Sequence, residues 1–283
     1  MRIGVVAKLD DERALTITKD IIEYCSSLGL DVFVEERLSR VIQLGRVFNL
    51  SNADVDYVVV VGGDGTVLNV LQLLGDNNLP IIAVKSGKRA FLCEVPPEGF
   101  KEFFSKFVKG EFTIKEYMRL ESIIGDSKLP YVLNEYVLTT SGMFRSKVTH
   151  FRVFKVVDGV KRLIYDILSD GIIIATSVGS TAYNLSVGGP LVDPDLDALI
   201  VTPLAPLSLC VRPVVLPSYV DVVVEVCSGS YSADVVADGN YVGRVESGGF
   251  IRVRKARKPA RFVRFGDVGF DYEKVFQGPV YGF

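Results

Sequence analysis

The stretch that most constrains this chain is residues 57–66, an apolar run that ends in a turn of three glycines, one carboxylate and one hydroxyl. The run is rich in valine, and this pattern predicts a strand buried on both faces of a parallel sheet. A turn at the carboxyl end of such a strand lies where open α/β sheets bind ligands. We therefore expect a binding site above Gly62, Gly63 and Gly65.

The chemistry expected of this turn is phosphate binding, with one exception. The glycines permit positive φ and bring backbone amides close to a ligand. Thr66 opens an apolar-periodic stretch, so the positive end of a helix dipole is expected at the same place. Asp64 would repel phosphate unless it binds a metal, a hydroxyl or a proton, and we interpret it as taking a proton from an alcohol. The alternative is a turn aspartate bonded to its own backbone.

Composition limits the class of protein. The 283 residues allow one large or two ordinary domains, and 48% hydrophobic residues with a net charge of −2 indicate a globular protein with no general attraction to nucleic acid or membranes. No signal-peptide pattern opens the chain, so we expect a cytoplasmic protein. The four cysteines form no C-x-x-C, which predicts buried free thiols rather than zinc or disulfide frameworks: Cys25, Cys93, Cys210 and Cys227.

Strands alternate with helices over the first part of the chain, which predicts a Rossmann-like parallel sheet. The expected strands are 2–7, 31–36, 57–61 and 79–84, and the expected helices are 11–28, 38–48 and a third from Thr66. Pro96-Pro97 marks a boundary, and a helix follows at 98–108. Mostly antiparallel strands are then predicted at 112–124, 131–140, 147–157, 161–168, 171–175, 220–226, 231–237 and 250–254.

These patterns predict three regions. Residues 1–96 form an N-terminal α/β domain that carries the glycine turn. Residues 97–265 form a C-terminal β-rich domain, and residues 266–283 form a tail packed back on the first domain.

Two stretches of the second domain also indicate ligand binding. A strand at 172–175 ends in small hydroxyl residues and glycine, and a short helix follows near Thr181, with Ser180 or Thr181 as its cap. Tyr183 and Ser186 share one face of this turn, where a ring can stack on a flat base. Asn134 and Glu135 interrupt an apolar alternation. Since adjacent strand residues face opposite sides, Asn134 is the better ligand candidate, and Glu135 is either a second one or a solvent residue.

These motifs together carry a family resemblance. Gly-Gly-Asp-Gly-Thr at 62–66, Asn-Glu at 134–135, and the segments 170–190 and 202–213 resemble the NAD kinase family over nearly the whole chain. The resemblance implies an N-terminal α/β domain, a C-terminal β-sandwich-like domain and a site between them. It implies transfer of a phosphoryl group from ATP or polyphosphate, with Mg²⁺, to the 2′-hydroxyl of the adenosine ribose of NAD, giving NADP. It also implies a homodimer or homotetramer whose site a neighbouring subunit completes.

The resemblance also implies residue roles. Asp64 matches the base or hydroxyl-orienting group, and Asp170 matches an aspartate at the nicotinamide end of NAD. Asn134 and Glu135 match a pair near the nicotinamide-side ribose and diphosphate. The other matches are Gly62, Gly63, Gly65 and Thr66 in the donor-phosphate loop, and Thr181, Ala182, Tyr183 and Ser186 around the adenine and nicotinamide. No protein metal ligand is assigned, because Mg²⁺ is often held by phosphate oxygens and water.

The chain departs from the family pattern at several positions. Lys85 replaces an asparagine, Ala90 a glycine, Ser177-Val178 the frequent Pro-Thr, and Leu207 a histidine. Lys85 and Arg89 are predicted to hold donor phosphates, with solvated surface cations as the alternative.

Two alternatives concern function more broadly. The basic run from Arg252 to Arg264 favours a solvated strand face over a nucleic-acid patch. A lipid kinase of the diacylglycerol type shares the glycine turn. A non-catalytic dinucleotide sensor would keep the acceptor pocket and lose donor binding.

Overall fold

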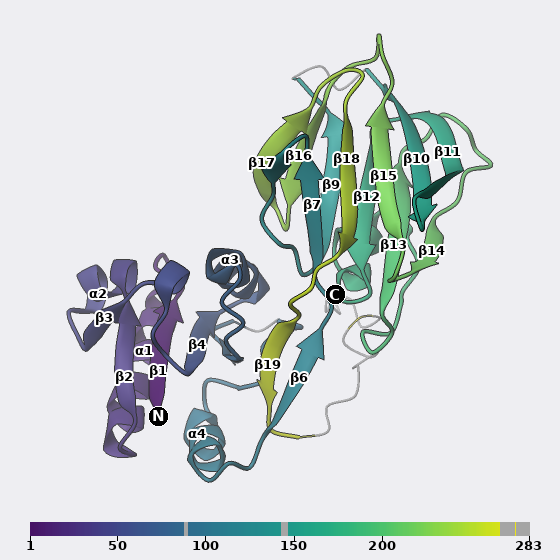
Figure 1. Ribbon diagram of the computed structural model, residues 1–283. Helices are drawn as coiled ribbons and strands as arrows, with labels where there is room; N and C mark the ends of the chain where they lie inside the picture. Colours follow the sequence, from purple (N-terminus) through teal and green to yellow (C-terminus); the bar gives the residue numbers. More distant parts are fainter. Residues whose placement is uncertain (88–89, 143–146, 267–274, 276–283) are drawn as a thin grey trace, which may run out of the picture. The chain divides into compact units, whose positions relative to one another are not determined.

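The protein is described from a computed structural model, which covers residues 1–87, 90–142, 147–266 and 275 (Figure 1). The chain divides into two compact units. The first contains residues 1–116 and the segment that begins at Ala260, and the second contains residues 117–259.

The first unit is built on a seven-stranded sheet with the order β3-β2-β1-β4-β5-β19-β6. The pairings of β1 with β2 and β4 and of β4 with β5 are parallel, which confirms the predicted parallel sheet. Two strands that were not predicted, β3 and β19, extend it in parallel beside β2 and β5. The four valines of β4 are fully buried, which fits its central place. The strands are β1 (Arg2–Ala7), β2 (Asp31–Glu35), β3 (Arg46–Phe48), β4 (Tyr57–Gly62), β5 (Ile81–Lys85), β6 (Thr113–Tyr117) and β19 (Ala260–Arg264).

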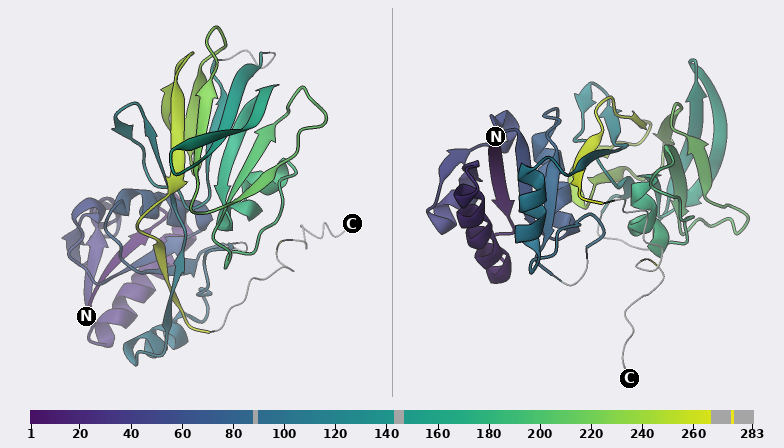
Figure 2. Two further views of the ribbon diagram at one scale, coloured as in Figure 1. Left: turned by 45° about the vertical axis from the view of Figure 1, so that its right-hand side comes forward. Right: turned by 90° about the horizontal axis from the view of Figure 1, so that it is seen from below.

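Helices cover both faces of this sheet. The apolar stripe of α1 joins the phenylalanines of α4 over Val59 and Val61, and the two helices lie side by side (Figure 2). Because strand residues alternate, Val58 and Val60 face the opposite side, where α3 packs against β4. The helices are α1 (Glu12–Ser27), α2 (Glu36–Ile42), α3 (Asp64–Leu74), α4 (Phe100–Val108) and the 3₁₀ turn η1 (Leu50–Asn52).

Several predicted boundaries in this unit were wrong. The helix expected at 38–48 ends at Ile42, because Gln43 and Gly45 adopt positive φ and the chain turns back to pair β3 with β2. The helix expected from Thr66 begins two residues earlier. The strand expected at 112–124 is two strands, of which β6 belongs to this sheet.

The division between the units also differs from the predicted boundaries. It falls at 116/117 and 259/260 rather than at 96/97 and 265/266. The reason is that α4, β6 and β19 pack with the first sheet. In Figure 1, β19, in yellow, lies beside β6, in teal, although the whole second unit separates them in sequence. Most of the predicted tail, 267–274 and 276–283, lies outside the described residues.

The second unit consists of two six-stranded sheets, ordered β11-β10-β15-β18-β7-β8 and β14-β13-β12-β9-β16-β17. Their facing side chains form one core, in which Phe151 and Val224 of one sheet meet Tyr136 and Ile174 of the other. This is the predicted β-sandwich-like domain. Its strands are β7 (Leu120–Ile124), β8 (Ser127–Lys128), β9 (Glu135–Thr140), β10 (Thr149–Val157), β11 (Val160–Ser169), β12 (Gly171–Thr176), β13 (Ala198–Leu204), β14 (Val214–Pro217), β15 (Asp221–Val226), β16 (Ala233–Ala237), β17 (Asn240–Val245) and β18 (Phe250–Lys255).

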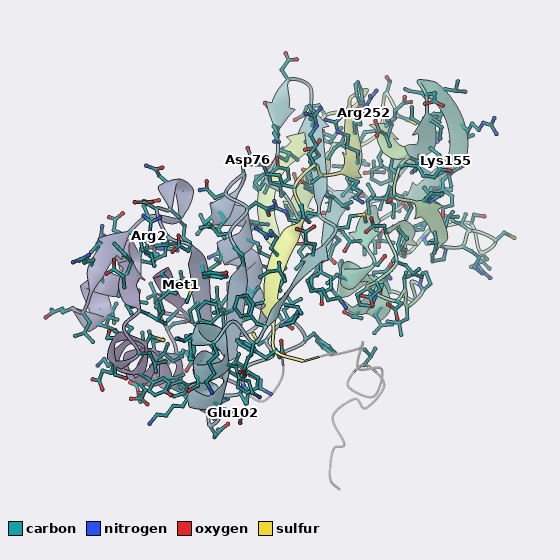
Figure 3. The ribbon with its side chains drawn as sticks, turned by 60° about the horizontal axis from the view of Figure 1, so that its bottom comes forward. Met1, Arg2, Asp76, Glu102, Lys155 and Arg252 are labelled. Atoms are coloured by element: carbon teal, nitrogen blue, oxygen red, sulfur yellow. The ribbon has the colours of Figure 1, made fainter. Side chains whose placement is uncertain are left out.

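The basic run near the end of this unit faces acidic partners. Arg252 pairs with Asp221, and Arg254 pairs with Glu121 at 2.6 Å. Figure 3 labels Arg252 on β18 and Lys155 on β10 among the side chains of this sheet. Cross-strand pairing of this kind favours the predicted solvated strand face, because the positive charge is locally compensated.

Two further sequence expectations can be compared with the structure. All four cysteines are free thiols, but only Cys25 and Cys93 are buried; Cys210 is exposed and Cys227 half-buried, so the prediction of buried thiols was wrong for these two. Among the described residues, none of the helices has the length and apolar character needed to span a membrane.

Candidate active site

The turn after β4 has the predicted place but not the predicted backbone. Gly62 ends the strand, Gly63 is the N-cap of α3, and none of the three glycines adopts positive φ. A Cβ on Gly62 would lie 2.5 Å from Thr66 Oγ1, so close packing requires glycine there. A Cβ on Gly63 or Gly65 would meet nothing within 4 Å, which leaves open space above their amides.

Asp64 is the first residue of α3 and is half-buried. Its Oδ2 accepts a hydrogen bond from the Phe91 amide and its Oδ1 one from the Leu92 amide, each at 2.9 Å. Its carboxylate is therefore held by a segment distant in sequence. The alternative of a turn aspartate bonded to its own backbone would have required bonds within residues 62–66. The helix dipole also favours negative charge at this position.

A cavity of about 510 Å³ opens at the carboxyl ends of β1, β2, β4 and β5, within the size range of small-molecule sites. It lies next to the glycine turn, at the edge of the sheet where the sequence predicts a binding site. Its lining contains both small turn residues and charged groups: Ala7, Lys8, Leu9, Asp10, Asp11, Glu35, Arg37, Gly63, Gly65, Thr66, Asn69, Ser86 and Gly87.

The acids of this cavity are largely engaged in holding the fold. Asp11 caps α1 by accepting from the Ala14 amide at 3.1 Å, and it accepts from Ser86 Oγ at 2.9 Å; these bonds lower the pKa of Asp11. Glu35 caps α2 by accepting from the amides of residues 37 and 38. Lys8 and Arg37 also line the cavity, each beside an acid: Arg37 Nε donates to Glu35 Oε1 at 3.0 Å, and Lys8 Nζ lies 3.9 Å from Asp10 Oδ1.

The predicted donor-binding cations are only partly described. Lys85 ends β5, pairs in register with Gly62 and is half-buried, so it stands beside the glycine turn. The amide of Ser86 donates to the Gly62 carbonyl at 3.0 Å and fixes that neighbourhood. Arg89, like Lys88, lies outside the described residues.

In the second unit, Glu135 begins β9 and is only 7% exposed. The alternative that it is a solvent residue was therefore wrong. Its Oε2 is buried without a hydrogen-bond partner. Burial raises the pKa of Glu135 to about 8, and the negative charge of Asp238 adds to that rise.

Asp238 is a residue that sequence reasoning missed. Its carboxylate accepts three successive amides, Leu133 at 2.8 Å, Asn134 at 2.9 Å and Glu135 at 3.0 Å. Burial raises the pKa of Asp238 to about 6, and these hydrogen bonds oppose the rise. The sequence gives only Asp238-Gly239 between two strands, which indicates a turn but not its contact with 133–135.

The hydroxyl-rich loop forms the 3₁₀ turn η2 (Val178–Thr181) and the short helix α5 (Tyr183–Ser186). The prediction that Ser180 or Thr181 caps the short helix was wrong. Ser180 Oγ instead bonds the backbone of Val192, and Thr181 Oγ1 donates to the Val178 carbonyl. Buried Asn184, also missed, accepts from Thr202 Oγ1 at 2.7 Å. Tyr183 and Ser186 are exposed, and Thr181 and Ala182 half-buried, so these four border the surface.

The structure brings some of the second-unit candidates together and separates one. The Thr176 amide donates to the Asn134 carbonyl at 2.8 Å, and a Cβ on Gly179 would lie 2.2 Å from the same oxygen. Asn134 and Glu135 thus adjoin the start of η2. Asp170 is exposed at the other end of β12. Five residues of extended chain place it about 17 Å from Ala175, which pairs with Glu135.

Among the described residues, no group of three or more His, Cys, Asp or Glu side chains is placed to hold a metal ion. Both oxygens of Asp64 already accept amides. The described part of the chain therefore offers Mg²⁺ an incomplete set of ligands.

Comparison with known proteins covers nearly the whole chain. Residues 3–112 match the ATP-NAD kinase N-terminal domain, and residues 133–265 match the ATP-NAD kinase C-terminal domain. An NAD kinase of Thermococcus sibiricus is 36% identical over 94% of this chain and 95% of its own length. An NAD kinase of Methanopyrus kandleri is 34% identical over 95% and 94%.

Two solved structures are also similar. An Archaeoglobus fulgidus NAD kinase in complex with ATP has a TM-score of 0.72 and 31% identity, with 98% of this chain and 96% of that chain covered. A yeast NADH kinase complexed with NADH has a TM-score of 0.81 over 93% and 83% of the two chains, at 22% identity, and shows the fold alone. The chain therefore belongs to the NAD kinase family.

Proposed function

We propose that this chain is an NAD kinase that transfers the terminal phosphoryl group of ATP to the 2′-hydroxyl of the adenosine ribose of NAD. The observation that carries the proposal is Asp64, a carboxylate held by two amides at the rim of a glycine turn and beside a cavity with two cations. Family membership over both domains supports the same reaction. The match to NAD kinases over most of the chain disfavours a lipid kinase.

On the donor side, the proposal assigns ATP to the cavity of the first unit. Phosphoryl transfer depends mainly on positioning and charge neutralisation, because the transferred group is loosely bonded in the transition state. The amides above Gly63 and Gly65 have open space, and Lys8 and Arg37 face the cavity. Lys85 would add a third cation. Mg²⁺, held mainly by phosphate oxygens and water, would neutralise further charge on the donor.

Asp64 is assigned the acceptor hydroxyl. As a carboxylate it accepts the proton that the 2′-hydroxyl loses as the oxygen attacks phosphorus, and ADP leaves with the electron pair of the broken bond. Its two amide donors fix the plane of the carboxylate, so the oxygens keep one orientation toward the alcohol. General-base catalysis of this kind contributes roughly 10²- to 10⁴-fold.

On the acceptor side, the proposal assigns NAD to the surface formed by Asn134, Glu135 and the loop through η2 and α5. Tyr183 offers an exposed ring for stacking on a base, and Thr181, Ala182 and Ser186 border it.

Asp170 bears on the oligomeric state, because it lies at the far end of β12 from this surface. It can therefore serve the same ligand most simply from a second copy of the chain. A homodimer or homotetramer is thus part of the proposal. A cytoplasmic location, expected from the sequence, is proposed as well.

The test incubates the purified chain with NAD, Mg²⁺ and either ATP or polyphosphate, and measures NADP. We expect NADP with ATP and none without a divalent cation. Polyphosphate as the better donor would overturn the donor assignment. NAD binding without NADP from either donor would indicate a dinucleotide sensor, and phosphorylation of diacylglycerol would indicate a lipid kinase. Light scattering of the same sample gives the subunit number.

A further inference from the structure

The segment that holds Asp64 is itself held, at the carbonyl side, by an arginine from the far end of the chain. We propose that Arg264, together with Glu94, is a positioning residue for Asp64. The inference rests on the proposed function, since it concerns the same carboxylate. All of its contacts lie within the first unit.

The contacts form a short chain. Asp64 accepts the amides of Phe91 and Leu92. The carbonyl of Leu92 accepts a hydrogen bond from Arg264 Nη1 at 3.2 Å. Residue 92 is thus fixed on both sides, by the carboxylate at its N–H and by the guanidinium at its C=O. The first bond restrains the peptide between residues 91 and 92, and the second restrains the peptide between residues 92 and 93.

Glu94 fixes the arginine. Its Oε2 lies 3.6 Å from Arg264 Nη1, and its Oε1 accepts the Phe265 amide at 3.0 Å. The side chains of Arg264 and Glu94 are only 11% and 13% exposed, so solvent screens the pair weakly. Glu94 Oε2 has no hydrogen bond of its own. Arg264 Nη1 therefore joins the Leu92 carbonyl to the Glu94 carboxylate.

The residues that hold Asp64 in place, Arg264 and segment 91–95, are themselves fixed by packing and hydrogen bonds. The Arg264 guanidinium lies 4.9 Å from the centre of the Phe262 ring, which is fully buried. The Phe265 ring packs edge-on against Phe103 at 5.2 Å. Segment 91–95 is tied to β5 as well, since the Lys85 amide donates to the Val95 carbonyl at 2.9 Å. The amides that receive Asp64 are thus anchored to two neighbouring strands of one sheet.

This rigidity has a chemical consequence. Misplacement of a reacting group by about 1 Å can lower a rate by roughly 100-fold. Losing the Arg264 contact frees the peptide at 92–93 and with it residue 92, whose amide holds Asp64 Oδ1. The carboxylate then samples orientations that do not face the hydroxyl. Substrate affinity is not expected to change, because Arg264 lines none of the cavity.

The experiment is a double-mutant cycle that measures kcat and KM with ATP and NAD, using an enzymatic cycling assay for NADP. Arg264→Gln is expected to lower kcat by about 10- to 100-fold, with both KM values within about 2-fold. In the Asp64→Asn background the same change is expected to alter kcat by less than about 2-fold, because residues that act as a unit are non-additive.

Arg261→Gln is the matched control. Arg261 lies on the same strand, where its Nε pairs with Glu116 Oε1 at 3.4 Å and its Nη1 donates to the Asn78 carbonyl at 3.4 Å, so its contacts are made to other segments than 91–95. It is expected to leave kcat within about 2-fold. If Arg264→Gln does not fold, Arg264→Lys replaces it in the cycle, since lysine keeps the charge and one donor but loses the planar fork.

The outcomes separate this inference from the proposed function. Multiplicative losses in the two backgrounds, or an equal loss in Arg261→Gln, would mean that Arg264 acts only through stability. Full turnover of Arg264→Gln beside an inactive Asp64→Asn would refute the positioning role and leave the proposed function intact. Full turnover of Asp64→Asn would remove the base role and the positioning role together.

Discussion

Asp64 in the first unit begins a helix and Glu135 in the second begins a strand, and the surroundings of these two acids are opposite. Asp64 is half-buried at a helix start, and both of its oxygens accept amides. Glu135 is buried, one of its oxygens has no partner, and burial raises its pKa to about 8. The comparison teaches that the surroundings of an acid, and not its residue type, set its chemistry: burial with an unpartnered oxygen is what raises the pKa of Glu135.

The second unit adds its own contrast within a pair. Three backbone amides point at Asp238, and none of them is left for Glu135 Oε2. Asp238 is therefore the anion of the pair at neutral pH, and Glu135 holds the proton. The two units use amides for the same purpose, which is to stabilise one chosen carboxylate.

The largest effect should come from removing the charge at Asp64. Asp64→Asn keeps the size of the side chain, so NAD affinity by calorimetry should stay within about 2-fold, whereas kcat should fall roughly 10²- to 10⁴-fold. Near-normal NADP formation would contradict the base role of Asp64, and the contrast between Asp64 and Glu135 would then have no catalytic meaning.

The glycines of the turn offer the next test. Gly62→Ala should destabilise the protein by about 1–3 kcal/mol in urea unfolding, because the new Cβ would lie 2.5 Å from Thr66 Oγ1. Gly65→Ala is the matched control: its Cβ meets nothing, so stability should hold, while KM for ATP should rise if phosphate occupies that space. Equal stability losses would show that the turn is merely tightly packed.

A smaller effect is expected at Lys85. Lys85→Ala should raise KM for ATP roughly tenfold, as the loss of a charged contact of about 1.5 kcal/mol implies, and should raise KM for NAD less. The comparison is made by steady-state kinetics with each substrate varied in turn. Equal changes in both KM values would indicate that Lys85 is a solvated surface cation and does not bind the donor.

The smallest effect concerns Glu135 and sharpens the contrast with Asp64. Its pKa is raised from the ordinary 4.5 to about 8 on folding, so the folded state binds the proton more tightly than the unfolded chain. The stability due to this group is then fully present below about pH 4.5 and falls as the pH rises to about 8.

Glu135→Gln cannot ionise, so its melting temperature should decline less over that window than that of the parent protein. Asp238 keeps its own decline, between its ordinary 3.8 and about 6, in both proteins. Parallel pH profiles above pH 6 would contradict the assignment of the proton to Glu135.

Local patterns could be predicted from the sequence, and contacts between distant segments could not. The valine run, the glycines and the periodicity after Thr66 are local, and they predict β4, the turn and α3 closely. Positive φ was the wrong reason for Gly62, since the real one is the Thr66 side chain one turn ahead. The amides that hold Asp64 come from 91–92, a segment with no pattern of its own.

The same limit explains what was missed in the second unit. Asp238 looks like an ordinary hairpin residue, and only the pairing of β9 with β16 brings it to Asn134. No strand was predicted at 260–264, and these residues were placed in the β-rich domain because nothing in the local sequence names β5 as their partner.

The late arrival of β19 bears on how the protein is made. When β5 leaves the ribosome, Val95 soon covers its outer edge at Val84, but the part near Ile81 stays open until β19 has been synthesised, after all of the second unit. Residues 117–259 are contiguous and can close their own sheets in the meantime. A nascent chain stopped short of Ala260 would thus carry an exposed strand edge, the kind of surface that chaperones cover and that otherwise aggregates.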